Sequence, residues 1–103
     1  MAERLSRKPW GSFSESDYTL EQLARASLIH MKEPPETKGD CKLPIREPDG
    51  TLNENAIVAA TIRIHQTDAP TELKRKAARK LVSLYRNVLK REPPQSLLKL
   101  AGM

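Results

Sequence analysis

Three proline-containing segments limit the length of any helix that this chain can form. They are EPPETKGD (residues 33–40), QTDAP (66–70) and EPP (92–94). Proline lacks the amide donor that a helix interior needs, and paired prolines cannot continue a helix. Between these breaks the apolar residues follow a helical period. The sequence therefore predicts a mainly α fold, a small bundle of about three helices with a short extended strand or hairpin between helices one and two.

The first helix is predicted to begin after Thr19 and to end near Ile29. Thr19 and Gln22 have the spacing of a capping box, and Tyr18 with Leu23 fits a hydrophobic staple. The apolar residues that follow keep helical spacing. Residues 33–40 are then expected to form an exposed loop.

The segment KLPIREPDGTLN (residues 42–53) combines a strand pattern, a turn and a helix start. Inward and outward positions alternate over residues 41–45, and Pro44 restricts such a strand to a sheet edge. Residues 47–50 fit a type I turn, and Asn53 is placed to cap the next helix. We interpret the strand and turn over 41–52 as scaffold, because they supply no nucleophile or base with a partner.

A helical hairpin is predicted over residues 54–91. Its first helix covers about 54–66, and its second covers about 70–90, with Asp68 or Ala69 as the cap and Pro70 in the first turn. Residues 96–100 are expected to add a short turn that folds back by its leucines. The predicted core consists of Leu23, Leu28, Ile57, Ile64, Leu73, Leu81 and Leu84.

A chain of 103 residues has room for one domain. We expect a flexible segment over residues 1–12 and a single small helical domain over 13–100. No apolar run approaches the ~18 residues of a membrane span. A single cysteine, Cys41, and the lack of a secretory signal favour a cytoplasmic protein.

Positive charge is concentrated in the second half of the chain. Residues 1–50 carry eight Lys/Arg and nine Asp/Glu, whereas residues 51–103 carry ten and four. Such a field attracts polyanions or acidic protein surfaces. On a helical wheel the second helix of the hairpin gathers its basic side chains on one side: Arg75, Lys76, Arg79, Arg86 and Lys90. These residues are the candidate contacts to a partner or to nucleic acid, and the alternative is an ordinary solvated surface.

No pattern of catalytic or metal-binding residues is recognisable. His30, Cys41 and His65 fall in separate predicted elements, without the paired spacing of a zinc site or a base beside a nucleophile. The four glycines are scattered, so no phosphate-binding loop is formed. We expect no enzymatic activity, no cofactor and no metal.

Two motifs carry a resemblance to a known group of proteins. They are LPIREPDGTLNENA (residues 43–56) and QTDAPTELKRKAARKL (66–81), within a similarity that covers about residues 10–98. The chain resembles a small uncharacterised module of phage and prophage proteins, found beside or within head-morphogenesis proteins such as prohead proteases. The resemblance implies a compact helical module and no catalytic residues.

The same resemblance implies a place in the cytoplasm of a bacterial host cell or in the virion. We therefore expect a non-catalytic interaction module associated with phage structural or assembly proteins. The alternative is a small basic DNA-binding protein with weak, sequence-independent affinity. The identity of the partner and the oligomeric state are left open.

Overall fold

The computed structural model describes residues 4–103, which form four α-helices and two small sheets of two strands each. The protein is thus a mixed α/β domain, and the prediction of a mainly α bundle of three helices is wrong. In chain order the elements are β1 (Leu5–Ser6), α1 (Leu20–Ala26), β2 (Ser27–His30), β3 (Cys41–Pro44), β4 (Leu52–Asn53), α2 (Glu54–Arg63), α3 (Thr71–Leu84) and α4 (Gln95–Leu100).

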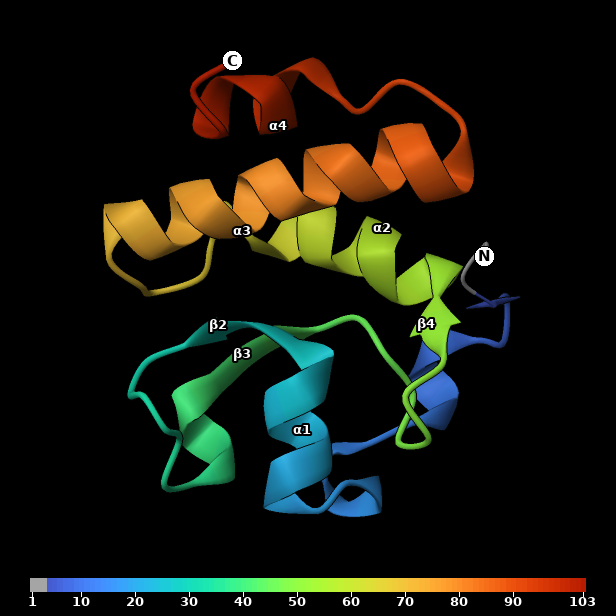
Figure 1. The fold of residues 1–103 in the computed structure, drawn as a ribbon, viewed down its shortest axis with the longest axis vertical. Coiled ribbons are helices and arrows are strands. Elements are labelled where there is room, and N and C mark those ends of the chain that lie inside the picture. Colours follow the sequence, from blue (N-terminus) through green and yellow to red (C-terminus); the bar gives the residue numbers. More distant parts are fainter. Residues whose placement is uncertain (1–3) are drawn as a thin grey trace.

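Helix α3 lies in the middle of the molecule (Figure 1). Helix α4 covers one side of α3, while α2 and the β2–β3 hairpin lie on the other, with α1 beyond the hairpin. The short strands β1 and β4 lie at one end, next to the start of α2. The two sheets are therefore small supports around a helical centre.

The first helix is shorter than predicted. It begins as expected, because the Thr19 side chain accepts a hydrogen bond from the Gln22 amide and the Gln22 side chain accepts one from the Thr19 amide. It ends at Ala26, where the Ser27 hydroxyl donates to the Leu23 carbonyl. Serine competes in this way for backbone groups at helix ends. The following residues pair with β3 as strand β2, so the predicted continuation to Ile29 is wrong.

The predicted strand in the middle of the chain is confirmed as β3. It pairs with β2 in antiparallel register, with Ile29 opposite Lys42 and His30 opposite Cys41. Within the described residues β3 has no second neighbouring strand, as expected for a strand that contains Pro44. The alternation is also confirmed, since Cys41, Leu43 and Ile45 are buried.

The described part of the N-terminal segment lies against β4 and α2. Strand β1 runs parallel to β4, with Leu5 opposite Leu52. The Asn55 side chain donates to the carbonyl oxygens of Arg7 and Lys8, at 3.1 and 3.0 Å. The predicted flexibility of residues 1–12 concerns motion and stays a prediction, and residues 1–3 lie outside the described part.

The predicted helical hairpin is present, but its first helix, α2, ends at Arg63 and not near Gln66, and its second helix starts later than predicted. Helix α3 begins at Thr71 with Pro70 as its N-cap, so the predicted caps at Asp68 or Ala69 are wrong. A π-helical segment, Tyr85–Leu89, continues α3 and ends at Lys90 in the left-handed conformation (φ 57°). Helix α4 supplies the predicted fold-back, with Leu97 fully buried.

The buried residues form two clusters. The larger lies between α2, α3, α4 and the strands and contains Ile57, Ile64 and Leu81 from the predicted core. Leu28, Leu73 and Leu84 only pack against it from its edge. Leu23 belongs to a second cluster beneath α1: Tyr18, Leu23, Ala26 and Cys41. Splitting the core in this way lets β2 and β3 lie between α1 and the helical hairpin.

Candidate functional site

The net positive charge of the molecule lies in the C-terminal part that contains α3, α4 and their connection. Residues 70–103 carry nine Lys/Arg and two Glu, a net charge of +7, whereas residues 1–69 carry nine Lys/Arg and eleven Asp/Glu, a net charge of −2. Because α3 and α4 lie on one side of the β2–β3 hairpin and α1 on the other, the sequence asymmetry becomes an asymmetry between layers (Figure 1). The side of α3 and α4 is the candidate surface for an anionic partner.

Helix α4 occupies part of the predicted basic stripe. Arg79 Nε donates to the carbonyl oxygen of Ala101 at 2.9 Å. A side-chain carbon added at Gly102 would lie 3.7 Å from Arg79 and 3.8 Å from Arg75. Both guanidinium groups therefore lie beside the end of α4, and Arg79 contributes to holding that helix in place.

The other predicted basic residues separate into two places. Arg86 and Lys90 line an open depression of about 520 Å³ together with Arg91 and Glu92. Lys76 lies elsewhere, in a groove between α3 and β2. The five residues predicted as one stripe thus occupy three different environments.

Within the depression, the charges are partly engaged. Arg86 lies 3.8 Å from the Glu92 carboxylate, with 43% of its side chain exposed. The Arg91 guanidinium lies 5.6 Å from the centre of the Tyr85 ring, which is buried. A ring covered by a guanidinium group gains a cation–π contact and offers no free face for stacking on a base. The depression can attract an anion but offers no aromatic platform.

His30 lies opposite Cys41 in the β2–β3 pair, but the two side chains are not joined by a hydrogen bond in the described residues. In the described residues no group of three or more potential ligands is arranged to hold a metal ion. His30 Nε2 lies 2.6 Å from the Ala24 carbonyl oxygen and Nδ1 lies 2.9 Å from the Glu33 carboxylate. These contacts fix the imidazole between α1 and the loop after β2, and His65 is exposed in the turn that follows α2. His30 therefore connects structural elements.

Cys41 has the environment of an unreactive thiol. Its side chain is buried in the cluster beneath α1. Burial raises the pKa of the Cys41 thiol, and the negative charges of Asp40, Glu15 and Glu33 raise it further. Since the thiolate is the nucleophilic form, this environment disfavours nucleophilic chemistry.

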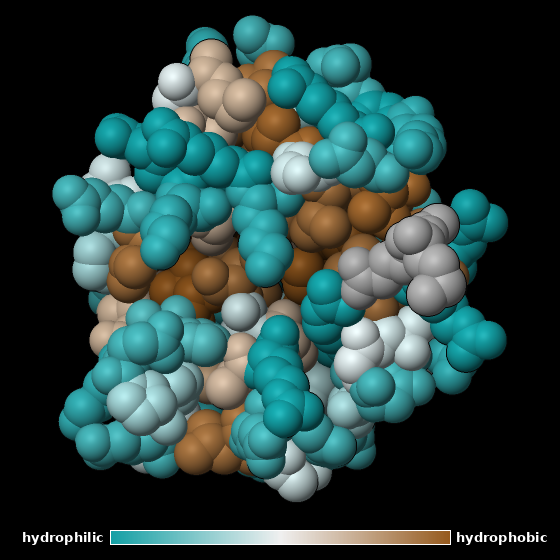
Figure 2. Space-filling view, viewed as in Figure 1, coloured by the Kyte–Doolittle hydropathy of each residue, from teal (hydrophilic) through white to brown (hydrophobic). Residues whose placement is uncertain are grey.

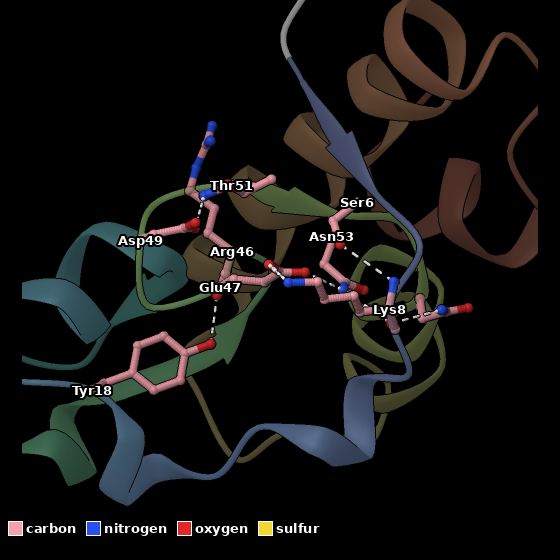
Figure 3. A network of polar contacts seen from close by, with 9 residues as sticks. Ser6, Lys8, Tyr18, Arg46, Glu47, Asp49, Thr51 and Asn53 are labelled. Atoms are coloured by element: carbon pink, nitrogen blue, oxygen red, sulfur yellow. Dashed lines mark hydrogen bonds and ion pairs between the residues drawn. The ribbon is translucent and has the colours of Figure 1, made fainter.

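The polar groups of residues 46–53 form a network that joins distant parts of the chain (Figure 3). Asn53 is fully buried, and its side-chain amide donates to the Glu47 carboxylate at 2.9 Å and to the Lys8 carbonyl at 3.1 Å. Its side-chain oxygen accepts from the Ala56 amide, which confirms the predicted cap of α2.

The predicted turn over residues 47–50 is also present. The Gly50 amide donates to the Glu47 carbonyl at 2.8 Å, and Gly50 has a φ of 94°, which favours glycine. The Tyr18 hydroxyl donates to the Arg46 carbonyl. Each of these groups is occupied by another part of the protein, so the contacts support the interpretation of this segment as scaffold.

Sequence reasoning missed Lys80 and Arg91, which line the groove and the depression beside predicted residues. Lys80 follows Lys76 by four residues, the spacing that places two side chains on one helix face. This spacing could have placed Lys80 beside Lys76 from the sequence alone. Arg91 gave no signal, because its position over Tyr85 depends on the left-handed turn at Lys90.

Comparisons with known proteins identify no family for this chain. No family model, no curated protein and no solved structure matches the chain. No helix in residues 4–103 has the length and apolar character needed to cross a membrane.

Proposed function

We propose that this protein is a non-catalytic interaction module that acts with phage structural or assembly proteins. The observation that carries the proposal is the segregation of charge, with a net +7 on residues 70–103 and a net −2 on the rest of the chain. A field of this kind raises the rate at which an oppositely charged partner is encountered and favours one orientation of docking. The resemblance of residues 43–56 and 66–81 to a phage module supplies the setting, in the host cytoplasm or the virion.

The environments of the reactive side chains support a role without catalysis. The Cys41 thiol is buried, and both ring nitrogens of His30 are engaged by protein oxygens. A catalytic nucleophile needs a neighbouring base and access to substrate. The base opposite Cys41 in the sheet, His30, has both ring nitrogens engaged by protein oxygens, so these contacts support a binding role for the protein.

Purified phage head proteins, namely a capsid, a portal or a prohead protease from the genome that encodes this chain, provide the test. We expect at least one to bind the wild-type protein in biolayer interferometry at about 0.15 M salt. Changing Arg86→Gln and Lys90→Gln should weaken this binding about tenfold, because two charges leave the depression. The matched control, Arg25→Gln with Lys32→Gln, removes the same charge from another surface and should change binding less than about twofold.

Duplex DNA is the second candidate partner, because the same net charge of residues 70–103 would attract phosphates. Each phosphate contact makes the slope of log affinity against log salt more negative by ~0.9. We expect only weak binding near physiological salt, since Arg79 is engaged with Ala101 and Arg86 lies 3.8 Å from the Glu92 carboxylate. The result that would favour DNA as the partner has two parts. Duplex DNA binds with sub-micromolar affinity that the Arg86 and Lys90 changes abolish, and the head proteins do not bind.

A further inference from the structure

A groove of about 280 Å³ lies between strand β2 and helix α3. One wall comes from Ser27–His30 and Glu33. The other wall comes from Leu73, Lys76, Ala77 and Lys80. The groove thus has a strand on one side and a helix on the other, and it is separate from the depression around Arg86 and Lys90.

The strand wall presents an edge of the sheet. Side chains alternate between the two faces of a strand, so a groove that follows one face is lined by every second residue. Here Ser27, Leu28, Ile29 and His30 all line the groove, which indicates that it runs along the edge of the strand. In the described chain β2 pairs only with β3, so no strand lies along this edge. An unpaired edge is a template for one more strand.

The helix wall combines apolar and basic side chains. Its residues follow the spacing i, i+3, i+4 and i+7, which places them on one face of α3. Leu73 is half-buried and Ala77 is buried, and the half-buried Leu28 faces them from the strand. Figure 2 shows hydrophobic residues in a band between the layer of α3 and α4 and the layer of β2, β3 and α1, with hydrophilic residues on both sides.

The charge of the groove is positive. Lys76 and Lys80 are exposed, and neither forms an ion pair with a carboxylate in residues 4–103. The acidic residue of the lining, Glu33, lies 2.9 Å from His30 Nδ1 and is therefore directed to the histidine. Two ammonium groups along a groove with both polar and apolar lining residues fit a segment that carries carboxylates as well as an apolar side chain.

We propose that the groove between β2 and α3 binds an extended acidic segment of a partner protein, which adds to β2 as a third strand. This inference rests on the proposed function as an interaction module and names its docking surface. Backbone hydrogen bonds along β2 supply affinity, an apolar side chain of the segment packs on Leu28, Leu73 and Ala77, and its carboxylates face Lys76 and Lys80. A strand of four residues accommodates a stretch of about 13 Å.

A blocked peptide of alternating glutamate and valine, about seven residues long, is the probe. Calorimetry should give a dissociation constant of about 100 μM or tighter, and amide NMR signals of Ser27–His30 should shift on binding. The variant Lys76→Glu with Lys80→Glu should bind about tenfold more weakly. Lys99→Glu, a charge reversal on α4, is the control and should change binding less than about twofold.

Two further peptides separate strand addition from simple charge attraction. A lysine–valine peptide should not bind, and the glutamate–valine peptide N-methylated at its three central residues should lose most of its affinity, because those three residues can no longer donate backbone hydrogen bonds to β2. Equal binding of the methylated peptide, or no binding of the parent peptide at about 1 mM, would overturn the inference. If the head-assembly proteins still bind and still depend on Arg86 and Lys90, the groove inference fails alone and the proposed function stands.

Discussion

Arg79 of α3 and Ala101 at the end of α4 are joined by a hydrogen bond of 2.9 Å, from Nε to the carbonyl oxygen. The last carbonyls of a helix have no donor within the helix, and a cation is favourable at that negative end. Helix α4 has only six residues, too few to be stable alone. Its position on α3 thus depends on the burial of Leu97 and Ala101 and on this contact.

The variant Arg79→Gln should lower the free energy of unfolding by about 1 kcal/mol, because the Ala101 carbonyl loses its charged donor. Urea unfolding followed by circular dichroism measures this change. Arg86→Gln is the matched control, since its ion pair with Glu92 is long and exposed, and it should cost less than about 0.5 kcal/mol. Equal costs for the two variants would contradict a structural role specific to Arg79.

A second prediction concerns Asn53. Replacing it by alanine removes the cap of α2 and leaves the buried Glu47 carboxylate without its 2.9 Å donor. The cap contributes about 1 kcal/mol and an unsatisfied buried group costs about 1–3 kcal/mol, so we expect a loss of about 3 kcal/mol.

Asn55→Ala is the control for this change. Asn55 also donates to backbone carbonyls, but it is exposed, and water can replace its hydrogen bonds. Its loss should cost less than about 1 kcal/mol by urea unfolding. A small effect of Asn53→Ala, similar to that of Asn55→Ala, would show that the segment is not the scaffold that we infer.

The features predicted correctly from the sequence depend on residues close together in the chain. The caps at Thr19 and Asn53 act over three residues, and the turn at Gly50 acts over four. The long basic helix also has a local cause, its repeated apolar positions. These elements were therefore predictable without knowledge of their neighbours.

The wrong predictions concern elements whose structure depends on contacts between segments distant in the sequence. Leu28 and Ile29 fit a helical period, but Ser27 ends the helix and Ile29 pairs with Lys42. Strand β1 was missed because its two residues have a partner only in Leu52 and Asn53. The basic residues predicted as one stripe lie on different surfaces for the same reason. Helix α4 packs beside Arg79, and strand β2 lies across a groove from Lys76.

A third prediction follows from the environment of Cys41. Burial raises the pKa of this thiol, so little thiolate should be present at about pH 8. Alkylation by iodoacetamide should be about tenfold or more slower in the native protein than in concentrated guanidinium chloride. Mass spectrometry of timed samples measures both rates. If the native protein is alkylated as fast as the unfolded chain, the Cys41 thiolate is accessible, and a catalytic role for Cys41 is supported.

A fourth prediction concerns stability at high pH. Burial raises the pKa of Tyr18 to about 12, and the negative charges of Glu47, Asp17 and Asp49 add to the effect. In the unfolded chain the phenol loses its proton near pH 10. Between about pH 10 and pH 12 the unfolded state therefore binds fewer protons than the folded state, and the free energy of unfolding falls as the pH rises.

The variant Tyr18→Phe isolates this effect, because the two proteins differ only in the Tyr18 hydroxyl. Near neutral pH it should be less stable by about 1 kcal/mol, since the Arg46 carbonyl loses the donor that Tyr18 provides. From about pH 10 upward the wild-type protein should lose about 2–3 kcal/mol that the variant keeps, so the two stability curves should approach each other and cross. Urea unfolding at a series of pH values measures both curves. A difference that stays constant through this range would mean that the Tyr18 phenol ionises equally in the folded and unfolded states, contrary to its buried position in the cluster beneath α1.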